Sequence, residues 1–323
     1  MQILHRLEAY SPPAAGAVVT IGNFDGVHLG HAQIVATGRR LAEQVGAAVV
    51  AITFEPHPSS VLSPEKTPAR LTRLSERLAL LAPAGVETAV VLHSEPALFE
   101  QSAEHFLRRV VRQCRPRAFV EGANFFFGKG RRGDVRTLEA HAGESGYELH
   151  VVAPVSCTAL PGAPAVSSSA IRTALAAGRV DEAAAMLGRP HRISGAVIDG
   201  ARRGRTIGFP TANLGAVEQM TPAEAVYAGV AQFEFGGLAP AAINIGPQPT
   251  FGGGEVRIEA HILDFAGDLY GRRLGLHFLK RLRGQMKFAG ADELVAQIAR
   301  DIDAVRALEP QVDALRAAGV IDL

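Results

Sequence analysis

The sequence predicts two domains of different class: an α/β domain built on a parallel sheet, then a small antiparallel β-barrel with helices at its C-terminal end. Up to about residue 155, short apolar runs typical of buried strands alternate with amphipathic segments typical of helices, which favours a parallel sheet covered on both faces. Beyond Gly188-Arg189-Pro190 the apolar runs are separated by turns rich in glycine and proline, as in a small barrel. We therefore expect one domain over residues 1–187 and a second over 188–323.

The elements of the first domain follow from the spacing of its apolar residues. Strands are expected at Ala17–Ile21, Ala47–Phe54, Thr88–Leu92, Ala118–Val120 and Leu149–Val152. Helices are expected at Ala32–Val45, Leu74–Leu81 and Ala103–Cys114. The alanine-rich stretch Ala174–Ala185 is interpreted as a further helix rather than as a linker.

The elements of the second domain are predicted in the same way. Its strands are expected at Ile193–Ile198, Val226–Phe235, Ala241–Ile245, Val256–Leu263 and Leu274–Leu279. Two closing helices are expected at Asp292–Leu308 and Pro310–Ala318, because apolar residues recur at helical spacing in the first of them.

Composition excludes several classes of protein. With 47% hydrophobic and 20% charged residues, the 323-residue chain has the composition of a globular protein. Its 33 lysines and arginines against 32 aspartates and glutamates give no general positive field, so we expect no nucleic-acid partner. We expect no membrane partner and a cytoplasmic location, because no apolar run approaches the roughly 18 residues that span a bilayer and the N-terminal residues lack the apolar core of a secretory signal. Cys114 and Cys157 have neither metal-ligand spacing nor a disulfide framework, which fits a reducing compartment.

Two histidines three residues apart follow the first predicted strand. Gly22 and Gly26 bracket a tight turn after this strand, and His28 and His31 lie one helical turn apart, with Gly30 between them. In a strand–loop–helix unit the free amides and the positive dipole end of the helix attract phosphate, and side chains one turn apart face the same way. The segment is interpreted as a site for a nucleoside triphosphate, with Gly30 keeping a Cβ away from the ligand. The alternative is a pair of ordinary surface histidines beside a glycine turn.

A second anion-binding element is expected at Val166–Leu175, where serines open a helix and an arginine follows within its first turn. Hydroxyls, free amides and a guanidinium can there bind one anion. Nucleotidyl transfer has to neutralise charge on both the attacked α-phosphate and the departing pyrophosphate. We expect His28 and His31 to serve the first, and Ser168 and Arg172 the second. An ordinary serine cap beside a surface arginine is the alternative.

These motifs, taken together, resemble the prokaryotic bifunctional riboflavin kinase/FAD synthetase (FMN adenylyltransferase) family. In the first half the resemblance also includes Phe54-Glu55-Pro56-His57-Pro58 and the segment 121–128, Glu-Gly-Ala-Asn-Phe-Phe-Phe-Gly. In the second half it rests on segments 208–214, 244–246, 249–251, 259–265, 268–271 and 287–288, in the family's order and at compatible spacing. The resemblance covers nearly the whole chain, and Phe-Pro-Thr-Ala-Asn at 209–213 is its most specific motif. It implies a nucleotidylyltransferase domain with a Rossmann-like sheet and a riboflavin kinase-like barrel.

In the first domain the resemblance implies that ATP lies over the glycine-rich segment, with His28, His31 and Asn124 near the reacting phosphates. The residues expected to bind ATP in this domain are Gly22, Asn23, Phe24, Asp25, Gly26, Gly30, Ser168 and Arg172. The flavin is expected toward His57 and the three phenylalanines, because a flat isoalloxazine ring needs aromatic or apolar walls. Alternate strand residues face opposite ways, so at least one phenylalanine is core, and we expect Phe125 or Phe127 to face the ligand.

In the second domain a loop rich in glycine and arginine, Gly200–Gly208, is suited to wrap a triphosphate. Thr211 and Asn213 occupy alternate positions of an extended segment and offer two oxygens on one side, which suits a Mg²⁺ ion that also bridges ATP phosphates. The resemblance implies that Glu259 takes the proton of the ribityl 5′-hydroxyl, although positioning and charge neutralisation carry most of the acceleration. It also implies that Arg283 lies on the flavin side. The residues expected to bind ATP in this domain are Gly204, Arg205, Thr206 and Gly208.

Three positions depart from the family pattern. Ala170 stands where the serine-rich motif usually has an arginine. Ala225 stands where a glycine is common, and Gln285 where an acidic residue often follows the arginine of the flavin-side loop. These departures bear on pyrophosphate binding and on how the flavin site closes.

The sequence thus predicts an enzyme that phosphorylates riboflavin to FMN with ATP and Mg²⁺ in its barrel, and adenylylates FMN to FAD in its α/β domain. One alternative is a single-activity nucleotidylyltransferase with a structural barrel, against which the set of Thr211, Asn213 and Glu259 argues. Another is a flavin-binding regulator without turnover, acting on nucleic acid through a cluster of arginines at 202, 203 and 205; the balanced net charge disfavours it.

Overall fold

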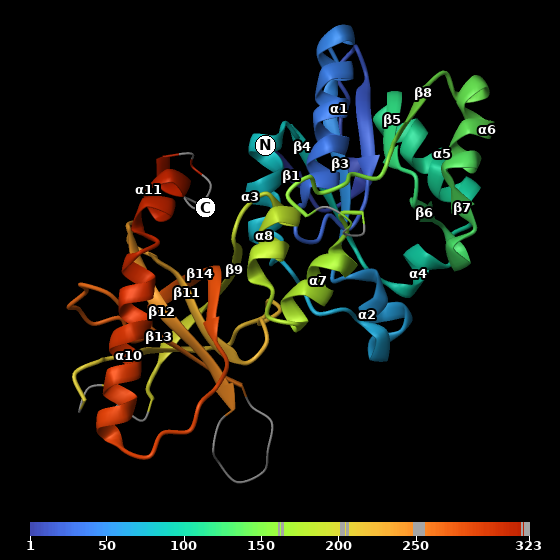
Figure 1. Ribbon diagram of the computed structural model, residues 1–323. Coiled ribbons are helices and arrows are strands. Elements are labelled where there is room, and N and C mark those ends of the chain that lie inside the picture. The colour runs from blue at the N-terminus through green and yellow to red at the C-terminus, as the bar shows by residue number, and fades with distance from the viewer. Residues whose placement is uncertain are drawn as a thin grey trace. The chain divides into compact units, whose positions relative to one another are not determined.

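The fold is taken from a computed structural model, which describes residues 1–160, 162, 165–200, 204, 207–247, 256–317 and 319 (Figure 1). The chain divides into two compact units. The first holds residues 1–68 and 74–156 and ends at Val166; the second holds Ala69–Arg73, Cys157–Gly162 and the chain from Ser167 on. Two predicted ATP-binding residues, Arg205 and Thr206, lie outside the described residues, as do Arg202, Arg203 and segment 249–251.

The first unit is built on a six-stranded parallel sheet in the order β1-β4-β3-β2-β5-β8. Its strands are β1 (Gln2–Leu4), β2 (Ala17–Ile21), β3 (Ala48–Glu55), β4 (Thr88–His93), β5 (Pro116–Gly122) and β8 (Glu148–Val152). Its helices are α1 (Leu29–Val45), α2 (Pro58–Leu62), α3 (Leu74–Ala84), α4 (Pro96–Phe99), α5 (Ala103–Cys114) and α6 (Val135–Ser145). A short hairpin of β6 (Phe126–Phe127) and β7 (Gly133–Asp134) follows β5. The predicted parallel sheet is confirmed.

Both faces of this sheet are buried, because its strands are apolar on both sides. Val18 of β2 belongs to a core cluster with Val35 of α1 and Leu81 of α3. Its neighbour Val19 belongs to the opposite cluster, with residues of α5 and α6. Figure 1 shows α1 and α3 apart from α5 and α6 in this layered arrangement. Near-continuous apolar strands are expected in a parallel sheet covered by helices on both faces.

The strand order changes direction at β2, which lies between β3 and β5. In an open parallel sheet, ligands bind in the crevice beyond the carboxyl ends of the strands at such a switch point. β2 and β5 are paired only from Ala17 to Val19. Further on, the Ile21 amide donates to the Glu121 carboxyl group instead (2.8 Å). The two strands therefore stop pairing before their carboxyl ends, where the loops that follow β2 and β5 begin.

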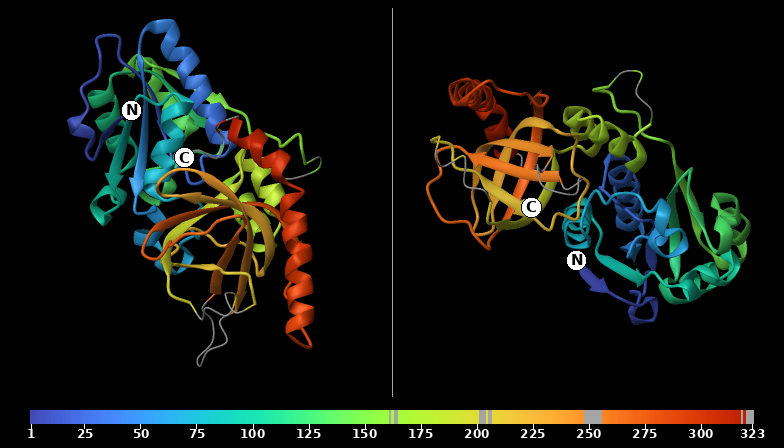
Figure 2. Two further views of the ribbon diagram at one scale, coloured as in Figure 1. Left: turned by 90° about the vertical axis from the view of Figure 1, so that its left-hand side faces the viewer. Right: turned by 90° about the horizontal axis from the view of Figure 1, so that it is seen from below.

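The second unit is built on a closed antiparallel barrel in the order β10-β13-β12-β11-β14-β9 (Figure 2). Its strands are β9 (His191–Ile198), β10 (Ala212–Gly215), β11 (Ala225–Phe233), β12 (Leu238–Pro247), β13 (Val256–Ile262) and β14 (Arg273–Arg283). Its helices are α7 (Ser168–Ala176), α8 (Val180–Leu187), α10 (Ala291–Arg306) and α11 (Glu309–Ala317). The predicted barrel and closing helices are confirmed: Val305 of α10 packs on Ala228 and Leu263, and Val312 of α11 on Val230 and Leu279.

The structure contains elements that were not predicted, among them β1, α2, α4 and α6, and it differs from the predicted set in two further places. The helix expected over Ala174–Ala185 is two helices, α7 and α8, which break at Gly178 with a φ of 72°. The short strand β10, absent from the predicted set, closes the barrel between β13 and β9. Contacts within the chain place α7 and α8 in the unit of the barrel, whereas the expected domain boundary at 187–188 follows them. That boundary stays a prediction.

Candidate functional site

The loop from Gly22 to His28 leaves the carboxyl end of β2 and ends at the N-terminus of α1. Backbone bonds run from Gly22 N to Ile52 O and from Val27 N to Phe24 O, both at 3.0 Å. Gly26 has a φ of 86°, and the non-glycine residues Phe24 and Val27 also have positive φ, 48° and 38°. Such residues cost of order 1–3 kcal/mol each and persist only where the surroundings hold them. The side chain of Phe24 is buried in the core, so its predicted contact with ATP is limited to its backbone.

The two predicted histidines come together at the start of α1. His28 is the N-cap residue, and its Nδ1 accepts the backbone N–H of His31 (3.3 Å). The two rings stack with centroids 3.7 Å apart and an interplanar angle of 14°. Because Nδ1 of His28 accepts, the neutral ring carries its proton on Nε2. The pair thus lies where free amides and the helix dipole favour an anion.

Gly30 makes room for His28. A Cβ at Gly30 would lie 3.1 Å from Cε1 and 3.2 Å from Nδ1 of His28, and 3.7 Å from the Val166 carbonyl oxygen. A Cβ there would require the His28 ring to shift by a few tenths of an ångström. That Gly30 also keeps a Cβ away from ATP stays a prediction.

The loop after β5 carries Asn124 and the three phenylalanines. Asn124 is exposed. Phe127 is buried in the core beside Phe106, with ring centroids 6.2 Å apart. Phe125 is partly exposed and stacks on Phe127 with centroids 5.2 Å apart, whereas the exposed Phe126 lies under the guanidinium of Arg131. Of the two candidates for a flavin wall, Phe125 is therefore accessible and Phe127 supports it from behind.

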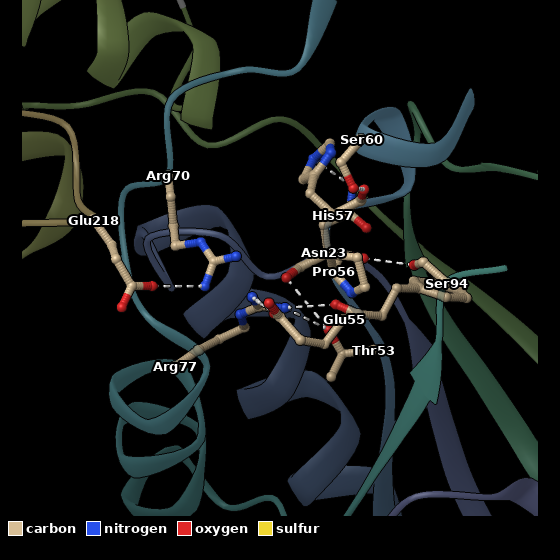
Figure 3. A network of polar contacts seen from close by, with 11 residues as sticks. Asn23, Thr53, Glu55, Pro56, His57, Ser60, Arg70, Arg77, Ser94 and Glu218 are labelled. Carbon is tan, nitrogen blue, oxygen red and sulfur yellow. Dashed lines mark hydrogen bonds and ion pairs between the residues drawn. The ribbon is translucent and has the colours of Figure 1, made fainter. Parts of the chain in front are cut away.

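His57 is tied to the loop after β2. It is the N-cap of α2, where its Nδ1 accepts the Ser59 N–H (3.2 Å), and its Nε2 lies 3.2 Å from the side-chain amide of Asn23 (Figure 3). The Thr53 hydroxyl donates to the Asn23 carbonyl (3.3 Å), and Arg77 of α3 donates to Thr53 in turn (3.1 Å). The structure brings the predicted residues Asn23 and His57 together. Sequence reasoning missed Thr53 and Arg77, because neither lies in a motif.

The serine-rich element opens α7, and Ser167 rather than Ser168 is its N-cap. The Ser167 hydroxyl accepts the Ala170 N–H (3.2 Å). Arg172 Nε donates to the Ala69 carbonyl within the second unit (2.6 Å). Ser168 and Arg172 belong to the second unit, and the histidine pair belongs to the first. Their joint action on one ATP stays a prediction.

A cavity of about 320 Å³ in the barrel unit gathers predicted residues of the kinase chemistry. Asn213, Glu259 and Asn244 lie opposite one another on the neighbouring strands β10, β13 and β12, so their side chains share one face. Glu259 is partly exposed, and its Oε1 lies 3.5 Å from Arg257 Nη1. The predicted residues that line this cavity are Gly204, Thr211, Asn213, Glu259 and Arg283. Gly208, with a φ of 90°, is in the turn that precedes them.

The oxygens around this cavity suit a magnesium ion. Thr211 offers a hydroxyl and the buried Asn213 an amide oxygen, and hard oxygen donors are the ligands Mg²⁺ prefers. A Cβ at Gly200 would come within 2.3 Å of the Asn213 amide, so the backbone of this glycine fixes that side chain. Among the described residues, no group of three or more histidines, cysteines and acids is placed to hold a metal.

A second cavity, of about 560 Å³, adjoins the first at Thr211, which lines both. Its wall includes Phe265, Asp268, Leu269 and Tyr270. Two adjoining cavities that share a hydroxyl residue offer room for two substrates whose reacting groups meet there. Three of these wall residues lie in segment 268–271, which is part of the resemblance but was given no role in the sequence analysis.

The guanidinium of Arg283 forms an ion pair with the carboxylate of Asp301. It donates to both oxygens of Asp301, with Nη2 to Oδ2 at 2.7 Å. Gln285 donates to Asn244 Oδ1 (3.0 Å) and to the Ile245 carbonyl (2.7 Å). Gln285, which departs from the family pattern, thus donates to Asn244, the residue that lies opposite Glu259. Asn244, which the sequence offered only as part of the resemblance, and Gln285, noted only as a departure, also line the cavity. Asp301 lines it too and was missed, because α10 brings it there.

Asp264 is the next acidic residue along the chain after Glu259. It lies outside both cavities and forms a two-pronged pair with Arg306, each distance 2.9 Å. The hydrogen bonds from Arg306 hold the pKa of Asp264 below its ordinary value. Of these two carboxylates, Glu259 is the one that lines a cavity.

Comparison with known proteins identifies the relatives of this chain. Residues 11–169 match the family model FAD synthetase, and residues 187–309 match the model Riboflavin kinase. The bifunctional riboflavin kinase/FMN adenylyltransferase of Escherichia coli K12 is 39% identical over 294 residues, which are 90% of this chain and 91% of that protein. The protein of that name from Pseudomonas fluorescens is 38% identical, over 95% of this chain and 98% of its own. The crystal structure of a macrolide-efflux protein from Streptococcus pneumoniae superposes with a TM-score of 0.84 at 28% identity, over 95% of this chain and 99% of that one. In the described part of this chain, no helix is long and apolar enough to cross a membrane.

Proposed function

Since this chain belongs to the family of bifunctional riboflavin kinases/FMN adenylyltransferases, we propose that its barrel unit carries the kinase site and its parallel-sheet unit the adenylyltransferase site. The enzyme phosphorylates riboflavin to FMN and adenylylates FMN to FAD, with ATP as the donor in both reactions. This assignment of the two sites rests mainly on the strand register of the barrel, which gathers Asn213, Asn244 and Glu259 on one cavity. His28 and His31, in contrast, lie at the switch point of the sheet.

In the barrel, we place riboflavin in the cavity with Glu259 and ATP in the adjoining cavity with Phe265 and Tyr270. Glu259 takes the proton of the ribityl 5′-hydroxyl, the hydroxyl oxygen bonds to the γ-phosphorus, and the bond to the β-phosphate oxygen breaks to release ADP. Thr211 and Asn213 are the residues that would hold Mg²⁺. The ion neutralises charge on the phosphates when it is bound.

In the parallel-sheet unit, a phosphate oxygen of FMN bonds to the α-phosphorus of ATP, and the bond to the β-phosphate breaks to release pyrophosphate. This step needs no general base, because the nucleophile is already an anion at neutral pH. The chain's part is to orient the phosphates and stabilise developing charge, with His28 Nε2–H and the first amides of α1 as donors. Phe125 and His57 provide the flavin side.

We propose that the substrates are small molecules only and that the enzyme is cytoplasmic. The near-neutral net charge of +1 supports the absence of a nucleic-acid partner. A structural barrel without activity, and a regulator without turnover, are both disfavoured by the match of residues 187–309 to the riboflavin kinase model and by the cavity that gathers Thr211, Asn213 and Glu259.

Paired variants test the two sites. Glu259→Gln keeps the shape of the side chain but not its basicity, so it should lower riboflavin phosphorylation by about 10²- to 10⁴-fold and leave FMN adenylylation unchanged. His28→Ala or His31→Ala should lower FAD formation by about 10² or more and leave FMN formation unchanged. Chromatographic separation of the flavins measures both, with Asp264→Asn as the matched control for Glu259. A folded variant that lost both activities equally would contradict the assignment.

A further inference from the structure

We propose that Arg77 is a positioning residue of the adenylyltransferase site, which holds the loop after β2 through the hydroxyl of Thr53; this inference rests on the site assignment above. Arg77 lies in the first turn of α3, and its side chain is only 5% exposed. Burial of a guanidinium is costly unless its donors are paired. The chain therefore retains a costly charge at this place, beside the carboxyl end of β3.

The Arg77 guanidinium binds the last three residues of β3 together. Nη1 donates to the Thr53 hydroxyl and to the Phe54 carbonyl, both at 3.1 Å, and Nη2 donates to Glu55 Oε2 at 2.9 Å (Figure 3). These are a hydroxyl, a carbonyl and a carboxylate, which the planar fork of an arginine can satisfy at once and the single ammonium of a lysine cannot. The carboxyl end of β3 is thereby fixed in position.

Thr53 carries this constraint to the loop. Its hydroxyl accepts from Arg77, so its one proton is directed to another acceptor, the Asn23 carbonyl at 3.3 Å. That carbonyl belongs to the peptide that enters Phe24, one of the two non-glycine loop residues with positive φ. A loop in this conformation persists only where its contacts hold it. The bond from Thr53 is one of those contacts, next to the strained residue.

The side chain of Asn23 is held from the opposite direction. Nδ1 of His57 accepts the Ser59 N–H, and its Nε2 lies 3.2 Å from Nδ2 of the Asn23 amide. Asn23 is therefore the point at which the chain of contacts from Arg77 meets the residue expected at the flavin.

Arg77 and Thr53 do not belong to the residues proposed to touch ATP or FMN, so their effect has to pass through the loop. A misplacement of about 1 Å at reacting groups can cost about 10² in rate. We accordingly expect Thr53→Val, which keeps the shape of the side chain but removes the hydroxyl, to lower kcat for FMN adenylylation by about 10- to 100-fold. Arg77→Met should do the same, and the double variant should be no slower than the slower single one, because both act on one link.

The test measures kcat and KM for FMN adenylylation, riboflavin phosphorylation and thermal unfolding on each full-length variant. Thr88→Val, at the amino end of β4 and also buried, is the matched control. A lower kcat in Thr53→Val with wild-type kinase activity and an unchanged unfolding midpoint supports the positioning role. Thr53→Val carries the test if Arg77→Met does not fold.

Wild-type kcat in Thr53→Val, or a loss that follows the unfolding midpoint alone, overturns the inference. His28→Ala, assayed in parallel, distinguishes failure of this inference from failure of the site assignment on which it rests. Loss of FAD formation in His28→Ala without loss in Thr53→Val refutes only the role of Arg77 and Thr53. Full FAD formation in His28→Ala refutes the site assignment, and the inference with it.

Discussion

Glu121 places a buried carboxyl group on β5, an interior strand of the parallel sheet. It lies on β5, is 2% exposed, and accepts the Ile21 amide where β2 and β5 no longer pair. Burial raises the pKa of Glu121 well above its ordinary value of 4.5, and the bond from Ile21 offsets this only in part. The neutral acid thus replaces a backbone partner beside the loop that carries His28.

The shifted pKa makes the stability of the first unit depend on pH. Above about pH 4.5 the unfolded chain releases the Glu121 proton while the folded chain keeps it, so stability falls as pH rises toward the folded-state pKa. The slope for one such proton is about 1.4 kcal/mol per pH unit. Glu121→Gln keeps the acceptor oxygen and should remove this slope in denaturant unfolding at pH 5, 6 and 7. Glu139→Gln, on the exposed face of α6, is the control; parallel profiles for wild type and Glu121→Gln would refute the account.

Residues that act within contiguous motifs were predictable, and residues that act through distant partners were not. His28 and His31 stand one helical turn apart in the sequence, and a helix N-terminus brings their rings together. Asn244 faces Glu259 only because β12 and β13 pair in one particular register. Likewise, nothing in the sequence near Arg77 indicates that it donates to Thr53, 24 positions away.

At the scale of elements, long periodic segments were predictable and short ones were not. β10 has four residues between Pro210 and Ala216, too few to show a period, and its place is set by pairing with β9 and β13. α6 buries Leu138 as its one core residue and so has weak apolar periodicity. The break between α7 and α8 follows from Gly178, where a Cβ would lie 3.0 Å from the Tyr227 hydroxyl and where φ is positive.

Helix α8 gives a prediction about where the barrel unit begins. It buries Val180, Ala183, Met186 and Leu187, and it belongs to the barrel's unit. A fragment of residues 188–323 would expose the surface that these residues cover, at about 1.5–3 kcal/mol for each large side chain. A fragment of residues 167–323 should therefore have the higher melting temperature, although both lack Ala69–Arg73 and both should phosphorylate riboflavin. Equal melting temperatures would favour the boundary at 187–188.

At the scale of the whole molecule, the proposed kinase and adenylyltransferase sites lie in two units, each with its own hydrophobic core. Each unit has its own group of proposed site residues: a helix N-terminus with stacked histidines in the sheet unit, and neutral oxygens with a carboxylate in the barrel. The fold class of both units was predictable, because strand runs and turns differ in kind before and after residue 188. FMN is the product of the barrel and the substrate of the sheet unit, so each site can be removed while the other is assayed.

The most direct measurement is the conversion of riboflavin to FAD by two variants, alone and mixed. With ATP and Mg²⁺, His28→Ala should stop at FMN, and Glu259→Gln should leave riboflavin unchanged but convert added FMN to FAD. An equimolar mixture of the two should restore FAD synthesis from riboflavin, because FMN released by one protein is adenylylated by the other. A mixture that makes no FAD, although each variant is folded and retains its own half-reaction, would contradict two self-sufficient sites, as would the loss of both half-reactions in either variant.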